Sequence, residues 1–272
     1  MTPDTSDTNA THEPWDPHQY LKFADERFRA AVELLQRVPV ESPSAIVDLG
    51  CGTGEMTRLI ADHWPSATVT GIDSSSAMLE QARAHSPDIN WVNGTIENWI
   101  PNHTFDLIYS NAALHWVSDH KQLFPRLVES LSDRGCLAVQ MPLSWPSRSH
   151  ALMRETLANG GPDGAPLGPI ELRAAMARKG VNDGRWYHDL LADSVRLLDI
   201  WESEYLQILD GEDAVLEWVR GTGLRPILQQ LEKGDIRQFM DAYRLRLREA
   251  YPRNTRGKTL YPFRRLFIVA QK

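Results

Sequence analysis

Three glycines at alternate positions interrupt an apolar run near the start of the chain. The run reads Ile46-Val-Asp48-Leu-Gly50-Cys51-Gly52-Thr53-Gly54, and a stretch with helical spacing follows at 55–64. Glycine permits a positive φ and lets a ligand approach the backbone without a Cβ in the way. Free N–H groups at the start of a helix favour anionic or polar ligand groups. The pattern predicts a strand, a tight turn and a helix at a nucleotide-like cofactor, with an ordinary glycine-rich connection as the alternative. The candidate cofactor-binding residues here are Asp48, Gly50, Cys51, Gly52 and Gly54.

Polar residues also follow the next two predicted strands, at 67–72 and 90–92. Asp73 comes 19 residues after Gly54, and a carboxylate there can accept hydrogen bonds from both hydroxyls of a ribose. Its alternative role is to cap the helix that opens at 74–78. The end of the third strand lies where an adenine ring would bind, unless it is a plain loop. We therefore add Ser74, Met78, Thr95 and Ile96 to the candidate cofactor-binding residues.

The fourth predicted strand, 105–109, leads into Asn111, His115 and Trp116. Ligands of open α/β sheets bind outside the carboxyl ends of the strands. We therefore expect Asn111 to contact the cofactor and His115 to line the reacting centre, although His115 and Trp116 could instead only pack the next helix. Cys51 could be read as a nucleophile, but the sequence favours a small residue beside the ligand.

The spacing of the glycines separates classes of cofactor. A dinucleotide fingerprint requires G-x-G-x-x-G, whereas Glu55 stands at the sixth position here. A phosphate-binding P-loop requires Gly-Lys-Ser/Thr, and no lysine follows Gly54. The motif therefore points away from both dinucleotides and nucleoside triphosphates.

Composition narrows the class of protein further. The chain has 272 residues, 42% of them hydrophobic, and a net charge of −7 without a marked run of Lys or Arg, so we expect neither nucleic acid nor a membrane as partner. Its two cysteines, Cys51 and Cys136, offer no disulfide framework, and the polar N-terminus lacks the apolar core of a signal peptide, so we expect a cytoplasmic protein. No H-E-x-x-H spacing occurs, and we expect no metal.

The order of predicted elements indicates a doubly wound, Rossmann-like α/β fold with a mostly parallel sheet. After a disordered tail at 1–14, an N-terminal helix begins at Asp16 and Pro17. The rest, 15–272, is expected to form one domain. A fifth strand at 135–141 is followed by a helical insertion over about 143–190 and a long strand at 195–209. Cap helices over about 212–250 and an antiparallel C-terminal strand at 265–270 complete the prediction.

The run Asp-Leu-Gly-Cys-Gly-Thr-Gly resembles the first motif of class I S-adenosylmethionine-dependent methyltransferases. The acidic residue after strand two and the strand-three end follow in that family's order. Segments along nearly the whole chain are similar to the trans-aconitate 2-methyltransferase family. They include Trp15-Asp-Pro-x-x-Tyr20, Asn111-Ala-x-Leu-x-Trp116, Trp218-Val-x-x-Thr222-Gly-Leu-Arg-Pro226 and Arg265-Leu-Phe-Ile-Val-Ala270. The chain departs from the family pattern at Thr95, His115 and Arg264, where an acidic residue, Gln and Pro are expected, and its 159–169 loop is richer in Gly and Pro.

The resemblance implies methyl transfer from S-adenosylmethionine to a carboxylate of a small di- or tricarboxylic acid, with trans-aconitate as the leading candidate. An ionised carboxylate needs no general base, since its pKa is about 4. Arginine forks suit the remaining carboxylates. We expect Arg225 first, then Arg265 and Arg264, to bind them, with Tyr20, His115 and Trp145 completing the pocket. Arg27, on the N-terminal helix, is a candidate for the carboxylate of the cofactor's methionine.

Two other functions fit the same cofactor features. One is a methyltransferase for another small molecule, such as an amine, phenol or natural product, with His115 as general base. The other is a non-catalytic protein that binds S-adenosylmethionine. Whichever acceptor is methylated, we expect the enzyme to be a monomer that acts by positioning its substrates.

Overall fold

The computed structural model describes residues 26–220 and 223–272 of the chain. Within these residues, seven strands form one sheet in the order β3-β2-β1-β4-β5-β7-β6. The strands β1 to β5 pair in parallel, whereas β7 runs antiparallel to both β5 and β6. This confirms the predicted Rossmann-like sheet with its antiparallel C-terminal strand. The strands are β1 (Ala45–Leu49), β2 (Thr68–Asp73), β3 (Asn90–Asn93), β4 (Phe105–Asn111), β5 (Leu131–Pro142), β6 (Leu197–Leu209) and β7 (Thr259–Gln271).

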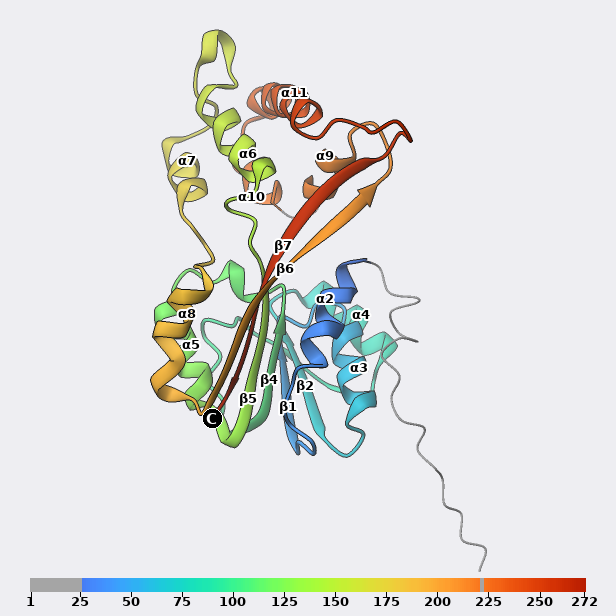
Figure 1. Cartoon of the computed structure of the whole chain (residues 1–272), viewed down its shortest axis with the longest axis vertical. Coiled ribbons are helices and arrows are strands. Elements are labelled where there is room, and N and C mark those ends of the chain that lie inside the picture. Colours follow the sequence, from blue (N-terminus) through green and yellow to red (C-terminus); the bar gives the residue numbers. More distant parts are fainter. Residues whose placement is uncertain (1–25, 221–222) are drawn as a thin grey trace, which may run out of the picture.

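Helices cover both faces of the sheet (Figure 1). One face carries α5 (His120–Glu129) and α8 (Gly184–Leu191), and the other carries α2 (Glu26–Leu35), α3 (Glu55–His63) and α4 (Ser76–His85). Side-chain caps fix where two of these helices begin. Ser75 accepts a hydrogen bond from Met78 N at α4, and Asp119 accepts one from Gln122 N at α5.

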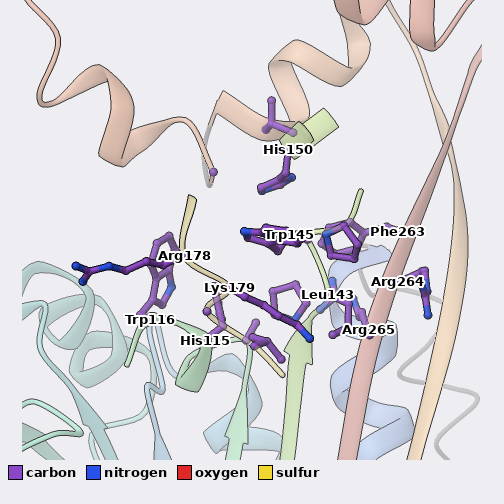
Figure 2. A pocket seen from close by; sticks show the side chains of 18 of the residues that line it. His115, Trp116, Leu143, Trp145, His150, Arg178, Lys179, Phe263, Arg264 and Arg265 are labelled. Carbon is purple, nitrogen blue, oxygen red and sulfur yellow. The ribbon is translucent and has the colours of Figure 1, made fainter. Parts of the chain in front are cut away.

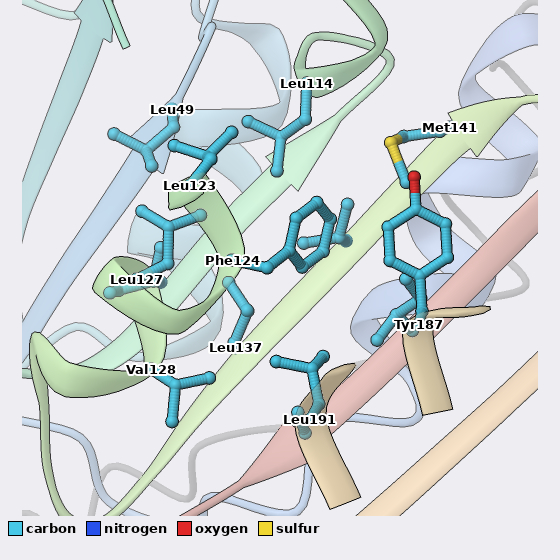
Figure 3. Packing of buried hydrophobic residues seen from close by; sticks show 14 of the residues in the cluster. Leu49, Leu114, Leu123, Phe124, Leu127, Val128, Leu137, Met141, Tyr187 and Leu191 are labelled. Atoms are coloured by element: carbon cyan, nitrogen blue, oxygen red, sulfur yellow. The ribbon is translucent and has the colours of Figure 1, made fainter. Parts of the chain in front are cut away.

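A hydrophobic core lies between the sheet and the helices α5 and α8 (Figure 3). Phe124 and Leu127 of α5 pack with Leu137 of β5 and with Tyr187 and Leu191 of α8 in one buried cluster. The helix α8 therefore belongs to the sheet layer, although it is the last helical part of the 143–190 segment.

The remaining helices form a cap beyond the carboxyl ends of the parallel strands (Figure 1). The antiparallel pair β6 and β7 runs without a break from Leu197↔Gln271 to Leu209↔Thr259, and so joins the sheet layer to the cap. The cap has its own hydrophobic core, which includes Leu152, Phe239 and Tyr243. Its helices are α6 (Arg148–Asn159), α7 (Ile170–Ala177), α9 (Ala214–Arg220), α10 (Arg225–Leu228) and α11 (Lys233–Ala250), and short 3₁₀ turns lie at η1 (Leu114–Trp116), η2 (Pro162–Gly164) and η3 (Ala192–Ser194).

Some boundaries differ from the sequence expectation. The strand expected at 265–270 extends over Thr259–Gln271, because its mixed polar and aromatic N-terminal half pairs with β6 along the whole length. Within the cap helices expected over about 212–250, the helical run is interrupted between α10 and α11. The expected start of the N-terminal helix, at Asp16 and Pro17, lies outside the described residues.

Across residues 26–220 and 223–272, no helix combines the length and the apolar character needed to cross a membrane. In the same ranges, no group of three or more His, Cys, Asp or Glu side chains is placed to hold a metal ion.

Candidate functional site

The glycine loop between β1 and α3 adopts the left-handed backbone that its sequence predicts. The φ angles of Gly50, Gly52 and Gly54 are +76°, +57° and +82°. The amides of Gly50 and Cys51 both donate to the carbonyl of Ile72, at 2.8 and 3.0 Å, so the loop is fastened to the end of β2. The loop is therefore a fixed feature of the fold.

The three glycines differ in what surrounds them. A Cβ on Gly50 would lie 2.1 Å from Ala113 Cβ, and one on Gly54 would lie 2.4 Å from the Trp91 ring, so both positions are closed by packing. A Cβ on Gly52 would meet only Met78 Sδ, at 3.8 Å. Of the three, Gly52 alone turns a bare stretch of backbone toward open space, where a ligand can approach it.

Asp73 lies beside this open stretch and accepts hydrogen bonds from two backbone amides, whereas the N-cap of α4 is Ser75 and not Asp73. Its Oδ2 accepts from the Gly52 amide at 2.9 Å, and its Oδ1 accepts from the Ser75 amide at 2.8 Å. Each oxygen keeps a second lone pair for a ligand hydroxyl. Ser74 is exposed next to it, and Met78 exposes 39% of its surface, which gives the site an apolar wall.

Asp48 and Cys51 lie beneath the loop. Asp48 is only 2% exposed and accepts a hydrogen bond from Thr57 Oγ1 at 2.6 Å, so its carboxyl ties β1 to α3. Burial raises the pKa of this carboxyl to about 7, against the effect of the Thr57 hydrogen bond. Burial also raises the pKa of the Cys51 thiol, which keeps it protonated and argues against a nucleophilic role.

The end of β3 is held in place by an arginine that sequence reasoning missed. Arg126 of α5 donates to the carbonyls of Glu97 at 2.8 Å and Ile96 at 3.0 Å. Ile96 is half-buried, with its Cδ1 3.7 Å from the point where a Gly50 Cβ would lie, whereas Thr95 is exposed. Nothing in the local sequence marks Arg126, because its partners lie 29 and 30 residues away.

The end of β4 contains unsatisfied polar groups next to this loop. The side-chain Oδ1 of Asn111 and the Nδ1 of His115 are buried and have no hydrogen-bond partner in the described structure. The next residue, Ala112, has a φ of +52°, which is uncommon for a residue other than glycine. Buried polar atoms without partners are costly, so a ligand that pairs with them is favoured here.

A pocket of about 640 Å³ opens between this end of β4 and the cap (Figure 2). Its wall includes the predicted residues Asn111, His115, Trp145, Arg264 and Arg265. It also includes residues that the sequence did not single out, among them His150, Arg154, Arg178 and Lys179.

One predicted residue of the described structure, Arg225, does not line this pocket. Arg225 is exposed at the start of α10, and the next residue, Pro226, lines the pocket in its place. Tyr20 and the side chain of Arg27 lie outside the described residues.

The described pocket wall carries more positive than negative charge, with five basic and two acidic side chains. The acids are Asp183 and Glu202. Arg265, 5% exposed, donates to Gln140 Oε1 at 2.8 Å and lies over the Phe263 ring at 4.8 Å. Such a wall suits a ligand with several negative charges.

The two pocket histidines are neutral near pH 7. Burial, followed by the charge of Arg265, lowers the pKa of His115 to about 3. Burial, followed by the charge of Arg154, lowers the pKa of His150 to about 4. Its Nδ1 hydrogen-bonds to Ser147 Oγ at 3.0 Å. Neither imidazole adds charge to the pocket or has the basicity of an efficient proton acceptor.

Comparison with known proteins agrees with this geometry. A family model described as a methyltransferase domain matches residues 46–135. The chain is 44% identical over 258 residues to the trans-aconitate 2-methyltransferase of Azoarcus sp. (strain BH72), which covers 94% of this chain and 98% of the relative. It is 43% identical over 259 residues to the protein of the same name from Escherichia coli O157:H7, which covers 95% of this chain and 98% of the relative.

Solved structures show the same fold at low sequence identity. The YcgJ protein from Bacillus subtilis aligns with a TM-score of 0.57 and 13% identity, over 90% of this chain and 98% of that one. Phosphoethanolamine N-methyltransferase 2 from Haemonchus contortus, solved with S-adenosylhomocysteine, aligns with a TM-score of 0.51 and 14% identity. That alignment covers 90% of this chain and 52% of the other.

Proposed function

Because the chain belongs to the trans-aconitate 2-methyltransferase family, we propose that it transfers a methyl group from S-adenosylmethionine to a carboxylate oxygen of trans-aconitate or a closely related polycarboxylic acid. The product is a monomethyl ester. The basic pocket at the end of β4 is the observation that carries this proposal, since it adjoins the glycine loop and suits a polyanion.

The residues around the glycine loop fit the cofactor. The Gly52 backbone is open, the Asp73 carboxylate has lone pairs for two ribose hydroxyls, and Asn111 offers a buried oxygen without a partner. Met78 and Ile96 give the apolar flanks that an adenine ring needs. Bound there, S-adenosylmethionine supplies an electrophilic methyl group on a sulfonium sulfur.

The acceptor requires little acid–base chemistry from the protein. A carboxylate with a pKa of about 4 is ionised near neutral pH, so the enzyme has to orient it and exclude water. Holding two reactants in line can lower a barrier by roughly 7–11 kcal/mol. The neutral His115 and the aromatic Trp116 and Trp145 line the pocket without placing a further charge beside the attacking oxygen.

An amine or phenol acceptor fits this pocket less well. Both must lose a proton near neutral pH, which requires a general base with a pKa close to the working pH. His115, the residue considered for that role, has a pKa of about 3 and is a weak base.

The test is an acceptor screen with S-adenosylmethionine labelled in the methyl group. We expect a base-labile methyl ester from trans-aconitate, and less or none from amines and phenols of similar size. S-adenosylhomocysteine binding is measured in parallel by calorimetry. Intact cofactor binding with no ester from any di- or tricarboxylic acid would refute carboxyl methylation. If no acceptor of any class is methylated, the chain is a non-catalytic cofactor-binding protein.

A further inference from the structure

Arg154 of α6 lies in the pocket wall with no acidic partner. Its guanidinium lies 4.3 Å from the centroid of the Trp145 ring. The side chain is half-buried, and no ion pair or hydrogen bond joins its guanidinium to any residue within 26–220 or 223–272. Its sequence neighbour Glu155 is engaged by Arg148, at 2.8 Å. Arg154 is thus a partly desolvated cation that faces the cavity and forms no ion pair with the described residues, although the charge of Glu155 acts on it from a distance.

Two other cations of the wall already have acidic partners. Lys179 pairs with Asp183 at 3.6 Å, and Arg264 pairs with Glu202. Arg178 is exposed and makes no ion pair with the described residues, so water solvates it well. Arg265 is already engaged, since it donates to Gln140 Oε1. A ligand charge gains most from a cation that is desolvated and not already engaged by a side-chain acceptor, and among the five basic residues of the wall this description fits Arg154.

The surroundings of Arg154 hold it ready for a planar anion. The cation–π contact with Trp145 uses no hydrogen bond, so the N–H donors of the guanidinium stay available for a carboxylate. Burial lowers the pKa of Arg154, but an arginine stays charged at neutral pH. His150, one turn earlier on α6, lies above Trp145 in Figure 2 and is kept neutral partly by Arg154 itself. It therefore adds no competing positive charge.

We propose that Arg154 binds a carboxylate of the acceptor acid other than the one that is methylated, and so determines the preference for acids with several carboxylates. This inference rests on the proposed function. In this proposal the cap binds a carboxylate that does not react, and the carboxylate that is methylated lies at the end of the sheet.

The test compares substrates that differ by one carboxylate. Trans-aconitate has three, and mesaconate, itaconate and trans-glutaconate each lack a different one of them. The variant Arg154→Met keeps an unbranched side-chain stem but loses the charge and the donors. We expect the KM for trans-aconitate to rise roughly 10- to 100-fold with kcat nearly unchanged, since charge-assisted hydrogen bonds are lost from binding. For the dicarboxylate that lacks the group bound by Arg154, measured as substrate or as competitive inhibitor, we expect less than a threefold change.

The matched control is Arg196→Met, which removes an exposed arginine that does not line the pocket and leaves the Arg148–Glu155 pair intact. Arg154→Lys keeps the charge without the planar fork and should recover only part of the affinity. Unchanged S-adenosylhomocysteine affinity shows that the variants are folded. An equal loss toward all four acids, or no loss, overturns the assignment of Arg154. A wild-type protein that methylates none of these acids refutes the proposed function instead.

Discussion

Asp73 and Gly52 are joined by a hydrogen bond of 2.9 Å, in which the glycine amide donates to the carboxylate. The bond links the acid at the end of β2 to the one position of the glycine loop that faces open space. The residue that is proposed to bind the ribose therefore also fixes the shape of the loop, and the two functions share one carboxylate.

Replacing Asp73 by Asn should weaken cofactor binding much more than it weakens the fold. An amide offers one accepting oxygen, so it cannot serve Gly52, Ser75 and two ribose hydroxyls together. Loss of charge-assisted bonds of about 1.5–3 kcal/mol predicts a Kd for S-adenosylhomocysteine that is roughly 10- to 100-fold higher, measured by calorimetry. Asp62→Asn, at an exposed acid paired with Arg58, is the control. A Kd within twofold of wild type for Asp73→Asn would contradict the ribose role.

The glycines at positions 50 and 52 should respond differently to the same substitution. Gly52→Ala meets no close atom and costs about 1–2 kcal/mol for a left-handed alanine. Gly50→Ala adds a contact of 2.1 Å with Ala113 Cβ and should leave little folded protein. We expect thermal unfolding to show a drop of a few degrees for Gly52→Ala, together with a cofactor affinity reduced about tenfold. Equal thermal stability of the two variants would contradict this ranking.

The cofactor loop could be predicted from the sequence because its geometry is local. Alternate glycines between a strand and a helix dictate a left-handed turn, and the chain direction brings the end of β2 beside it. The positions of Asn111 and His115 could also be predicted from the sequence, because both lie at the end of a strand that stops at the same edge of the sheet as β1.

The acceptor pocket depended on the cap, which local patterns do not specify. Arg154 lies mid-helix, and it can only be recognised once α6 is placed over the end of the sheet. Arg225 was expected in the pocket from its Gly-Leu-Arg-Pro context. Successive residues of a helix point about 100° apart, and here Pro226 takes the inward direction while Arg225 is exposed.

The pH dependence of stability should reveal the buried Asp48. Its pKa is raised from 3.8 to about 7, so between these values the native state holds a proton that the unfolded state releases. This contribution to stability is present at low pH and is lost as pH rises to about 7. His115 and His150, with pKa values lowered from 6.5 to about 3 and about 4, act in the opposite direction. Below pH 6.5 the unfolded state binds two more protons at these histidines, which lowers stability as pH falls.

Between about pH 4.5 and 6 the proton that Asp48 keeps in the native state offsets one of the two protons that the histidines gain in the unfolded state. Across these three groups the unfolded state therefore binds one proton more than the native state. Removing the Asp48 proton should make the rise of stability with pH steeper in Asp48→Asn than in the wild type, by about 1.4 kcal/mol per pH unit. Asparagine can still accept the Thr57 hydrogen bond. Urea unfolding across this pH range measures both slopes. Identical slopes would mean that Asp48 is ionised in the native protein.

The ion pair between Arg264 and Glu202 at the pocket wall should compete with the acceptor acid for the arginine. Glu202→Gln removes this competitor and one negative charge from the wall, so the KM for trans-aconitate should fall. Both side chains are partly exposed, 49% and 34%, and an exposed pair is worth less than about 1 kcal/mol, so we expect a decrease of about two- to fivefold. The control is Glu249→Gln, which makes the same charge change on α11 at an exposed residue that does not line the pocket. The difference between the two variants should shrink at 0.5 M salt, where the screening length is only about 4 Å. Equal effects of the two substitutions would show that the acid responds to net charge and not to the release of Arg264.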